Sequence, residues 1–437
     1  MAVIEVVGQG FVGLTTAMLA ADAGHEVAGI EVDPNRAERL RGADPPFSEP
    51  GVRDHLGLLL RERRLRIAGP GYRGAEPAVL VVAVPTPTLP GGRVDDSAVV
   101  SALTRFWDRR RHELVIVRST LPTGHSAVLT DRFGGLRDSY VHWPEFLNQG
   151  RALPETRQPD RVVVGTDSAR AAGAMAILLK SFGFDQHLIR WHSVGEAEAV
   201  KQFSNAVLAA NQVLGAEIAR LCERAGLDAR SVLASVALDA RLSPELLGPK
   251  PPLVDSCLRK DLTALIASAG PGESARILRA SLAQAAAQHD AAAERVVRHV
   301  GALPRGTRVL IVGAGFSPGV SDTKGSMLWD LLPRLRDTPV EVWDPYAEDG
   351  ARTAMRPAVP VASLPDALAR AGVVVLLVDH PEVYEVPWSR VLASLTARGG
   401  VVLDYCAMFR SPGSGDPFVR AVVHGWGSSS SCRLCAG

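Results

Sequence analysis

A chain of 437 residues exceeds a single ordinary core, since a domain usually holds about 100 to 200 residues, so we expect two or three domains. Hydrophobic residues make up 46% of the chain and charged residues 22%, which is typical of a folded globular protein and excludes an intrinsically disordered one. The formal net charge of +1 gives no reason to expect a nucleic-acid partner, so the arginine-rich stretches Arg61–Arg66 and Arg109–Arg111 are interpreted as solvated helix faces.

The N-terminal residues do not resemble a targeting segment, because no basic leader precedes the apolar run and Glu5 interrupts it. No stretch reaches the roughly eighteen apolar residues of a membrane span, so we expect a cytoplasmic protein without a membrane partner. An odd number of scattered cysteines does not suggest a disulfide framework. Cys432 and Cys435 form a lone CxxC, which predicts no metal site, in a tail (426–437) that we expect to be disordered.

In chain order, the first predicted elements are short β-branched runs that alternate with amphipathic segments. The runs are Val3–Val7, Val27–Glu31, Val79–Val84, Leu114–Val117 and Arg161–Val164. This alternation is typical of parallel strands joined by crossover helices, so residues 1–192 are predicted to form a doubly wound Rossmann domain.

The pattern then changes to long stretches at helical spacing, Ala197–Arg224 and Ser274–His299, which predict a central helical domain over residues 193–300. A proline-rich segment, 243–253, interrupts these helices. Strand-like runs resume after Pro304, at Arg308–Val312, Val340–Asp344, Val373–Val378 and Val401–Asp404. Residues 301–425 are therefore predicted to form a Rossmann-like nucleotide-binding domain, and the fold class of the chain is α/β.

The segment Gly8-Gln9-Gly10-Phe11-Val12-Gly13 is a GxGxxG motif that follows the first predicted strand and opens a helix. Its glycines permit a tight turn and close approach of a pyrophosphate, and the helix N-terminus offers N–H donors to that anion. Glu31 ends the next predicted strand, where a carboxylate accepts hydrogen bonds from ribose hydroxyls and repels a 2′-phosphate. The motif therefore predicts NAD as the cofactor. Glu5, inside the first strand, needs a buried partner that the sequence does not identify.

Gly313-Ala314-Gly315 follows a later strand but lacks a third glycine, with Asp344 as an available acidic partner. We interpret it as a turn at a nucleotide-binding edge, not as a second dinucleotide site. Asp379 and His380 follow another strand and could touch a substrate. A loop histidine without a defined partner is more often structural, and we take that interpretation for His380.

Lys201 and Asn205 lie four residues apart on a predicted helix, so they share one face and could meet a developing oxyanion. Alone, such a pair is more often a polar helix surface. Cys257 alone would likewise be a small buried hydrophobe more often than a nucleophile. The surrounding motifs change this interpretation.

Several ordered motifs together resemble the UDP-glucose/GDP-mannose dehydrogenase family over nearly the whole chain. They are Gly8–Leu14, Gly24–Val27, Ser48–Gly51, Val84–Pro87, Arg118–Pro122, Pro144–Leu147, Pro159–Arg161, Lys201 with Asn205, Asp239–Arg241 and Ser256–Asp261. The resemblance implies oxidation of the C6 primary alcohol of a nucleotide sugar, UDP-glucose to UDP-glucuronate, with NAD and a cysteine-bound intermediate.

The resemblance also implies roles for individual residues. The catalytic set would be Cys257, Lys201, Asn205, Asp261, Glu145 and Thr120. The cofactor would contact Gly8, Gly10, Phe11, Val12, Gly13, Glu31, Arg36, Pro85, Thr86, Thr120 and Lys324. The substrate would contact Glu145, Phe146, Leu147, Lys201, Asn205 and Arg241. In the family, the arginine that corresponds to Arg241 reaches a neighbouring subunit, so a homodimer or larger homo-oligomer is expected.

The departures from the family concern the sugar nucleotide. A glycine-rich loop before the cysteine is replaced by Lys250–Asp255, whose prolines and branched residues cannot follow the same backbone path. Ser317 replaces a lysine, Lys324 an arginine and Trp143 an asparagine. Three alternatives remain: the same chemistry on another nucleotide sugar or nucleoside, a catalytically impaired binding protein, and a two-electron hydroxyacid dehydrogenase. Retention of Cys257 favours the full redox chemistry, because the last two have no use for a thiol.

Overall fold

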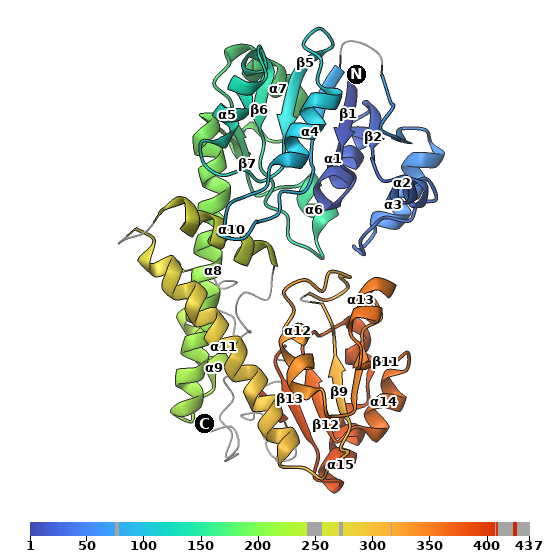
Figure 1. Ribbon diagram of the computed structural model, residues 1–437, viewed down its shortest axis with the longest axis vertical. Helices are drawn as coiled ribbons and strands as arrows, with labels where there is room; N and C mark the ends of the chain where they lie inside the picture. Colours follow the sequence, from blue (N-terminus) through green and yellow to red (C-terminus); the bar gives the residue numbers. More distant parts are fainter. Residues whose placement is uncertain are drawn as a thin grey trace. The chain divides into compact units, whose positions relative to one another are not determined.

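The computed structural model describes residues 1–74, 78–242, 256–270, 274–315, 317–406, 408–409 and 423–425. The chain divides into two compact units (Figure 1). Unit 1 comprises Met1–Asn205 and Thr263–Pro271, and unit 2 comprises Ala206–Leu262 and Gly272–Gly437. The replaced loop Lys250–Asp255, Phe316 and the CxxC tail lie outside the described residues. The division into three domains stays a prediction.

Unit 1 contains an eight-stranded sheet in the order β3-β2-β1-β4-β5-β6-β7-β8. The strands are β1 Val3–Val7, β2 Glu26–Ile30, β3 Leu65–Ala68, β4 Ala78–Val82, β5 His112–Val117, β6 Tyr140–His142, β7 Val162–Gly165 and β8 Ile189–His192. Neighbouring strands run parallel except β6 and β7, which are antiparallel. The strand order reverses between β1 and β4, so loops after these strands diverge at a point where doubly wound proteins bind ligands.

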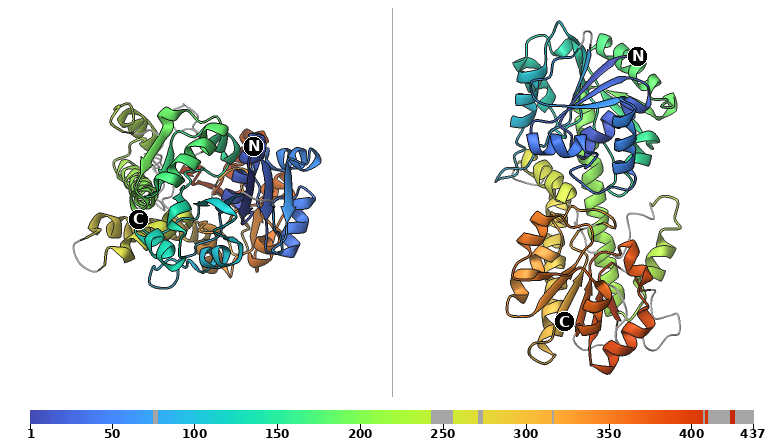
Figure 2. Two further views of the ribbon diagram at one scale, coloured as in Figure 1. Left: turned by 90° about the horizontal axis from the view of Figure 1, so that it is seen from above. Right: turned by 90° about the vertical axis from the view of Figure 1, so that its right-hand side faces the viewer.

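Helices cover both faces of this sheet (Figure 2). They are α1 Phe11–Asp22, α2 Pro34–Arg41, α3 Val52–Arg61, α4 Ser97–Phe106, α5 His125–Arg132, α6 Ala152–Arg157, α7 Ala169–Ser181 and the start of α8 Val194–Arg224, with 3-10 turns at Arg137–Ser139 and Gln186–Leu188. Along β4, Val79 and Val81 pack in one apolar cluster, whereas Leu80 and Val82 pack in the other. Strands enclosed on both faces need continuous apolar runs, which explains why the sequence revealed them.

Unit 2 contains a six-stranded parallel sheet in the order β11-β10-β9-β12-β13-β14. The strands are β9 Val309–Val312, β10 Val340–Trp343, β11 Val359–Pro360, β12 Val373–Leu376, β13 Val401–Asp404 and β14 Val423–Gly425. The helices are the rest of α8, α9 Ala229–Val236, α11 Arg276–Gly301, α12 Leu328–Leu331, α13 Asp349–Ala354, α14 Leu364–Arg370 and α15 Trp388–Ala397, with 3-10 turns at Leu332–Leu335 and Pro381–Glu385. Helix α10 Ser256–Ser268 begins in unit 2, and its residues from Thr263 onward belong to unit 1. The predicted α/β fold class is confirmed.

The structure supplies the missing partner of Glu5. This carboxylate is buried in β1 and forms ion pairs with Arg111 and, at 3.2 Å, with His112 Nε2. The interpretation of Arg109–Arg111 as a solvated helix face is therefore wrong: the three residues lie in a turn before a strand, where Arg109 and Arg110 are exposed and Arg111 is only 7% exposed. A buried carboxylate requires such a partner, and here it comes from the loop before β5.

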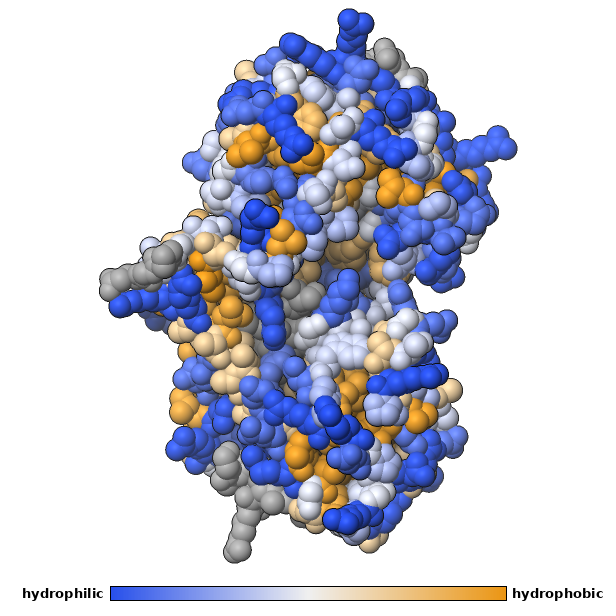
Figure 3. Space-filling model, viewed as in Figure 1, coloured by the Kyte–Doolittle hydropathy of each residue, from blue (hydrophilic) through white to orange (hydrophobic). Residues whose placement is uncertain are grey.

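The visible surface in Figure 3 is mostly hydrophilic, and apolar residues are exposed in small groups between charged ones. In the described part of the chain, no helix combines the length and the apolar character that crossing a bilayer requires.

Candidate active site

The glycine motif forms the turn between β1 and α1, and each glycine has its own reason. Gly8 has φ of +88°, and a Cβ on Gly13 would lie 1.8 Å from the Gly8 carbonyl oxygen, so both positions exclude larger residues for internal reasons. Gly10 differs, because its φ is −78° and, among the described residues other than its chain neighbours, no atom lies within 4 Å of its would-be Cβ. The open space at Gly10 fits a ligand that approaches the backbone at the N-terminus of α1, where N–H groups face an anion.

Glu31 lies directly after β2, beside this turn, as predicted. Its carboxylate accepts hydrogen bonds from the backbone N–H of Asp33 at 3.0 Å and of Gln9 at 3.4 Å. Arg36 lies 3.9 Å from it at the start of α2. A buried, oriented carboxylate with spare lone pairs suits a ribose diol. The residues present therefore fit NAD.

The segment after β4 is held beside the segment after β5. Ser119 accepts a hydrogen bond from Val84 N at 3.0 Å and donates one to Val84 O at 2.8 Å. This pairing fixes the start of the Pro85–Thr86 loop, in which Pro85 is exposed and Thr86 is buried. The segment with Pro85 and Thr86 and the segment with Thr120, which both contain predicted cofactor residues, thus leave the same edge of the sheet.

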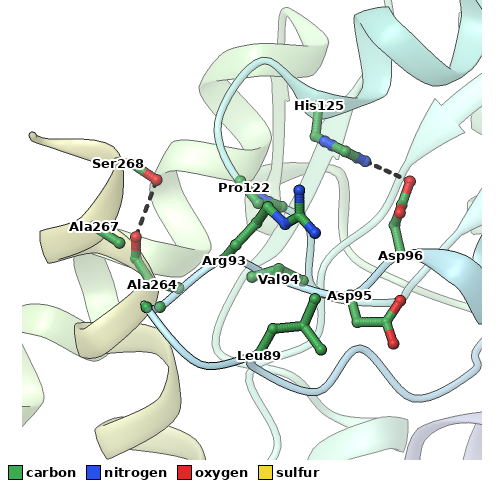
Figure 4. Close-up of a pocket in the computed structure, with 12 residues that line it drawn as sticks. Leu89, Arg93, Val94, Asp95, Asp96, Pro122, His125, Ala264, Ala267 and Ser268 are labelled. Carbon is green, nitrogen blue, oxygen red and sulfur yellow. Dashed lines mark hydrogen bonds and ion pairs between the residues drawn. The ribbon is translucent and has the colours of Figure 1, made fainter.

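A hollow of about 590 Å³ borders Pro122, two residues beyond Thr120 (Figure 4). Its other walls come from the loop around Arg93 and from the last turns of α10 near Ala267. His125 Nε2 pairs with Asp96 at 2.8 Å at its rim. Pro122 therefore borders an open hollow, whereas Leu121 beside it is buried in the core.

Glu145 and Lys201 form the central contact of the site in unit 1. Lys201 Nζ lies 3.1 Å from Glu145 Oε1, and Leu147 N donates to Glu145 Oε2 at 2.8 Å. Burial raises the pKa of Glu145, but Lys201, the Leu147 amide and Arg118 outweigh it and hold that pKa below the ordinary value. Phe146 adds an aromatic wall, since Lys201 Nζ and Arg161 Cζ lie 5.4 Å and 4.2 Å from its ring centroid.

The first turns of α8 hold the segment after Thr120. Buried Glu198 accepts hydrogen bonds from Gly124 N at 2.6 Å and Ser126 N at 2.7 Å, which caps α5 from another helix. Gln202 accepts from Thr123 N at 3.2 Å. The sequence analysis missed both, although Glu198 and Gln202 lie at helical spacing to Lys201 and Asn205.

Carboxylates also hold the loop that follows Glu145. Asn148 N donates to Glu155 Oε2 at 2.7 Å, and Gly150 N donates to Glu49 Oε1 at 2.6 Å. Together with Leu147 N on Glu145, three amides of this loop bind three different carboxylates. We name residues 145–152 the carboxylate-held loop.

Asn205 and Thr120 are two further predicted residues of unit 1. Asn205 is buried on α8, one turn beyond Lys201. In the described chain, no hydrogen bond joins Thr120 to Glu145, and Thr120 stays only partly buried. The observed contacts thus join the side chains of Glu145, Phe146 and Lys201 and the backbone amide of Leu147.

In unit 2, Cys257 lies exposed in the first turn of α10. Asp261, one turn later, is 3% exposed and pairs with Lys260 at 3.1 Å. Exposed Arg241 pairs with Asp239 at 2.5 Å, and Lys324 is exposed as well.

The second glycine turn, after β9, contains its own buried acid. Asp344 accepts from Ala314 N at 2.7 Å, and His380, fully buried, lies 3.2 Å from it. Gly319 N donates to His380 Nδ1 at 3.1 Å, so the histidine is a structural residue, as interpreted. Glu31 likewise accepts a hydrogen bond from its own turn, at Gln9 N, but Asp344 differs in that it is also paired with a buried histidine.

Three successive stretches of the chain match domains of one known family. Residues 2–183 match the NAD binding domain of the UDP-glucose/GDP-mannose dehydrogenase family, residues 195–284 its central domain and residues 310–411 its UDP binding domain.

A UDP-glucose 6-dehydrogenase of Pseudomonas aeruginosa is 31% identical, with 82% of each chain covered. A UDP-glucose dehydrogenase from Pyrobaculum islandicum is similar in structure, with a TM-score of 0.83, 29% identity and 98% of each chain covered. A UDP-D-ManNAc dehydrogenase from Pyrococcus horikoshii shares the fold, with a TM-score of 0.81, 23% identity and coverage of 97% of this chain and 99% of that one.

Proposed function

This chain belongs to the UDP-glucose/GDP-mannose dehydrogenase family and has its NAD-binding domain, and on that basis we propose that it oxidises the C6 alcohol of UDP-glucose to the carboxylate of UDP-glucuronate. The overall reaction consumes one water and two NAD⁺ per sugar and releases two NADH and three protons. Cys257 would hold the intermediate between the two oxidations.

The observation that carries this proposal is the contact between Lys201 Nζ and Glu145 Oε1 at 3.1 Å. It combines a cation suited to a developing oxyanion with an ionised carboxylate suited to proton transfer from water. Asn205 lies one helical turn from Lys201, so an oxygen held by the ammonium would find an amide donor nearby.

The chain's own residues have separate tasks in the two oxidations. Bound NAD supplies a hydride acceptor for each of them. Lys201 and Asn205 stabilise the substrate oxygen as its proton leaves and a hydride departs from carbon. The Cys257 thiolate adds to the resulting aldehyde to give a thiohemiacetal, from which a second hydride and proton leave to give a thioester.

Hydrolysis then releases the product. Glu145 or Asp261 takes a proton from water, whose oxygen attacks the thioester carbon, and the C–S bond breaks with departure of the Cys257 thiolate. The depressed pKa of Glu145 keeps that carboxylate ionised at neutral pH, as this role requires. Thr120 would help position the water.

UDP-glucose is proposed because relatives at 31% and 29% identity are UDP-glucose dehydrogenases. The sequence of Lys250–Asp255 favours a second candidate, the same oxidation of another nucleotide sugar or nucleoside, because prolines and branched residues replace a flexible loop. Cytoplasmic location stays a prediction.

We also propose a homodimer or larger homo-oligomer, with Arg241 reaching the neighbouring subunit. Val207, Leu214 and Leu221 of α8 support it, because they are 56%, 48% and 59% exposed and lie at seven-residue intervals. Apolar residues at this spacing form a stripe that suits packing against another helix.

The test is NADH formation, followed by absorbance, with UDP-glucose first and then other UDP-, GDP- and dTDP-hexoses. We expect two NADH per sugar for one of them. Cys257→Ser should lower turnover by about a hundredfold or more, because a hydroxyl does not ionise to hold the intermediate. Cys222→Ser is the matched control and should keep activity, since Cys222 is buried in the core of unit 2.

One NADH per sugar would refute the cysteine route and support a two-electron dehydrogenase. Two NADH per sugar with a hexose other than UDP-glucose would select the second candidate. Full activity of the Cys257→Ser variant would remove the thiol from the mechanism.

A further inference from the structure

Arg118 is a buried cation at the end of β5 that the proposed mechanism leaves without a task. It is 6% exposed, and within the described part of the chain no carboxylate comes within ion-pair distance of its guanidinium. Its Nε is fully enclosed and has no hydrogen-bond partner there. A buried charge without a paired anion is unfavourable, so an unpaired guanidinium beside a binding site indicates a missing partner.

An aromatic ring holds this guanidinium in place. Arg118 Cζ lies 3.9 Å from the ring centroid of Trp143, which is 4% exposed and stacks on Phe182 at 6.0 Å. Burial lowers the pKa of Arg118 to about 10, against the effect of Glu145, so the group is still charged at neutral pH. The ring fixes the orientation of the cation but does not neutralise it.

Among the described residues, the carboxylate whose charge acts on Arg118 is that of Glu145, and it is already engaged. Glu145 binds Lys201 and accepts a hydrogen bond from Leu147 N, whereas Arg118 acts on it only through its charge. Glu145 is therefore not available to neutralise the Arg118 guanidinium, which can pair with a further negative group.

We propose that Arg118 is a further substrate-binding residue, whose guanidinium binds the carboxylate that the oxidation creates on the sugar. This inference rests on the proposed function, in which the reacting carbon lies beside Glu145 and Lys201. The alcohol substrate is neutral at that carbon and leaves Arg118 unpaired, whereas the product carboxylate offers two oxygens to a planar, forked cation. Arg118 thus distinguishes the product from the substrate.

The test measures ligand binding by calorimetry for wild type, Arg118→Met and Arg118→Lys. The two ligands are UDP-glucose and UDP-glucuronate; if another UDP-sugar is the one that releases NADH, its alcohol and its acid take their place. Arg118→Met should weaken binding of the acid by about tenfold or more and of the alcohol by less than about twofold. Arg118→Lys should retain part of the affinity for the acid, because it keeps the charge and loses the fork.

Thermal unfolding of the free protein separates this role from a structural one. Removal of an unpaired buried charge should leave the Tm of Arg118→Met unchanged or raise it. A Tm lowered by several degrees, or equal weakening of both ligands, would make Arg118 a structural residue and overturn the inference while the proposed function stands. If wild type binds neither ligand and releases no NADH, the proposed function fails and this inference fails with it.

Discussion

His142 should make the stability of unit 1 depend on pH. It ends β6, is fully buried, and neither ring nitrogen has a hydrogen-bond partner within the described part of the chain. Burial lowers the pKa of His142 from the ordinary 6.5 to about 3, since a buried imidazolium loses its hydration. The folded state therefore keeps the ring neutral at a pH where the unfolded chain binds a proton.

The sign and size of the effect follow from this difference. A histidine whose pKa is depressed in the folded state contributes fully above the unfolded value of 6.5, and the contribution is lost as the pH falls toward about 3. At pH 5, which is about 1.5 units below the unfolded value, the loss is roughly 2 kcal/mol. That loss corresponds to a Tm lowered by about 4 to 8 °C for a unit of this size.

The measurement is thermal unfolding at pH 7 and pH 5 for wild type and His142→Leu. At pH 7 the two should be similarly stable, because leucine replaces a neutral ring without partners. At pH 5 the free energy of unfolding of the variant should exceed that of wild type by roughly 2 kcal/mol. His187→Leu, which removes an exposed histidine, is the matched control and should follow wild type at both values. If wild type and His142→Leu lose the same stability between pH 7 and pH 5, His142 is not the cause of the pH dependence.

Two further changes test the cofactor site and the oligomer. Gly10→Ala should weaken NAD binding by about tenfold or more without lowering the Tm of the free protein, because the new methyl group meets only the ligand. Gly13→Ala should instead destabilise the fold, because its methyl group would clash with Gly8. Calorimetry and thermal unfolding check both, and equal behaviour of the two variants would contradict the argument. Leu214→Glu should convert an oligomer to monomers by light scattering, and an unchanged mass, or a wild-type monomer, would contradict the role of the α8 stripe.

The sequence predicted the elements that carry a local signal. Runs such as Val79–Val84 are apolar on both faces of the sheet, so they could be recognised as strands from the sequence. The GxGxxG motif could be recognised as well, because the backbone of its turn requires glycines. The strands β3, β6, β8, β11 and β14 were missed; β3 and β8 each contain an arginine, and β6, β11 and β14 have only two or three residues. Pairing with a neighbouring strand, rather than propensity, makes them strands.

The site was predicted only where family motifs pointed to it. Lys201 and Glu145 were each expected, but their direct contact depends on the register of α8 against the loop after β6. The missed residues Glu198 and Gln202 hold the segment after Thr120 from a distance of more than 70 positions in sequence. No periodicity encodes such pairs, although the shared helix face with Lys201 was a usable signal.

The carboxylate-held loop has a consequence for how this enzyme can diverge. Because its amides at Leu147, Asn148 and Gly150 are each bound to an acid, the backbone that follows Glu145 cannot shift without breaking charge-assisted hydrogen bonds. Lineages that acquire a new sugar would then conserve this backbone and change side chains or other loops. The sequence already has this pattern, since it retains Glu145 and Phe146 while Lys250–Asp255 has diverged. Chemistry and substrate choice can therefore evolve at different rates in one polypeptide.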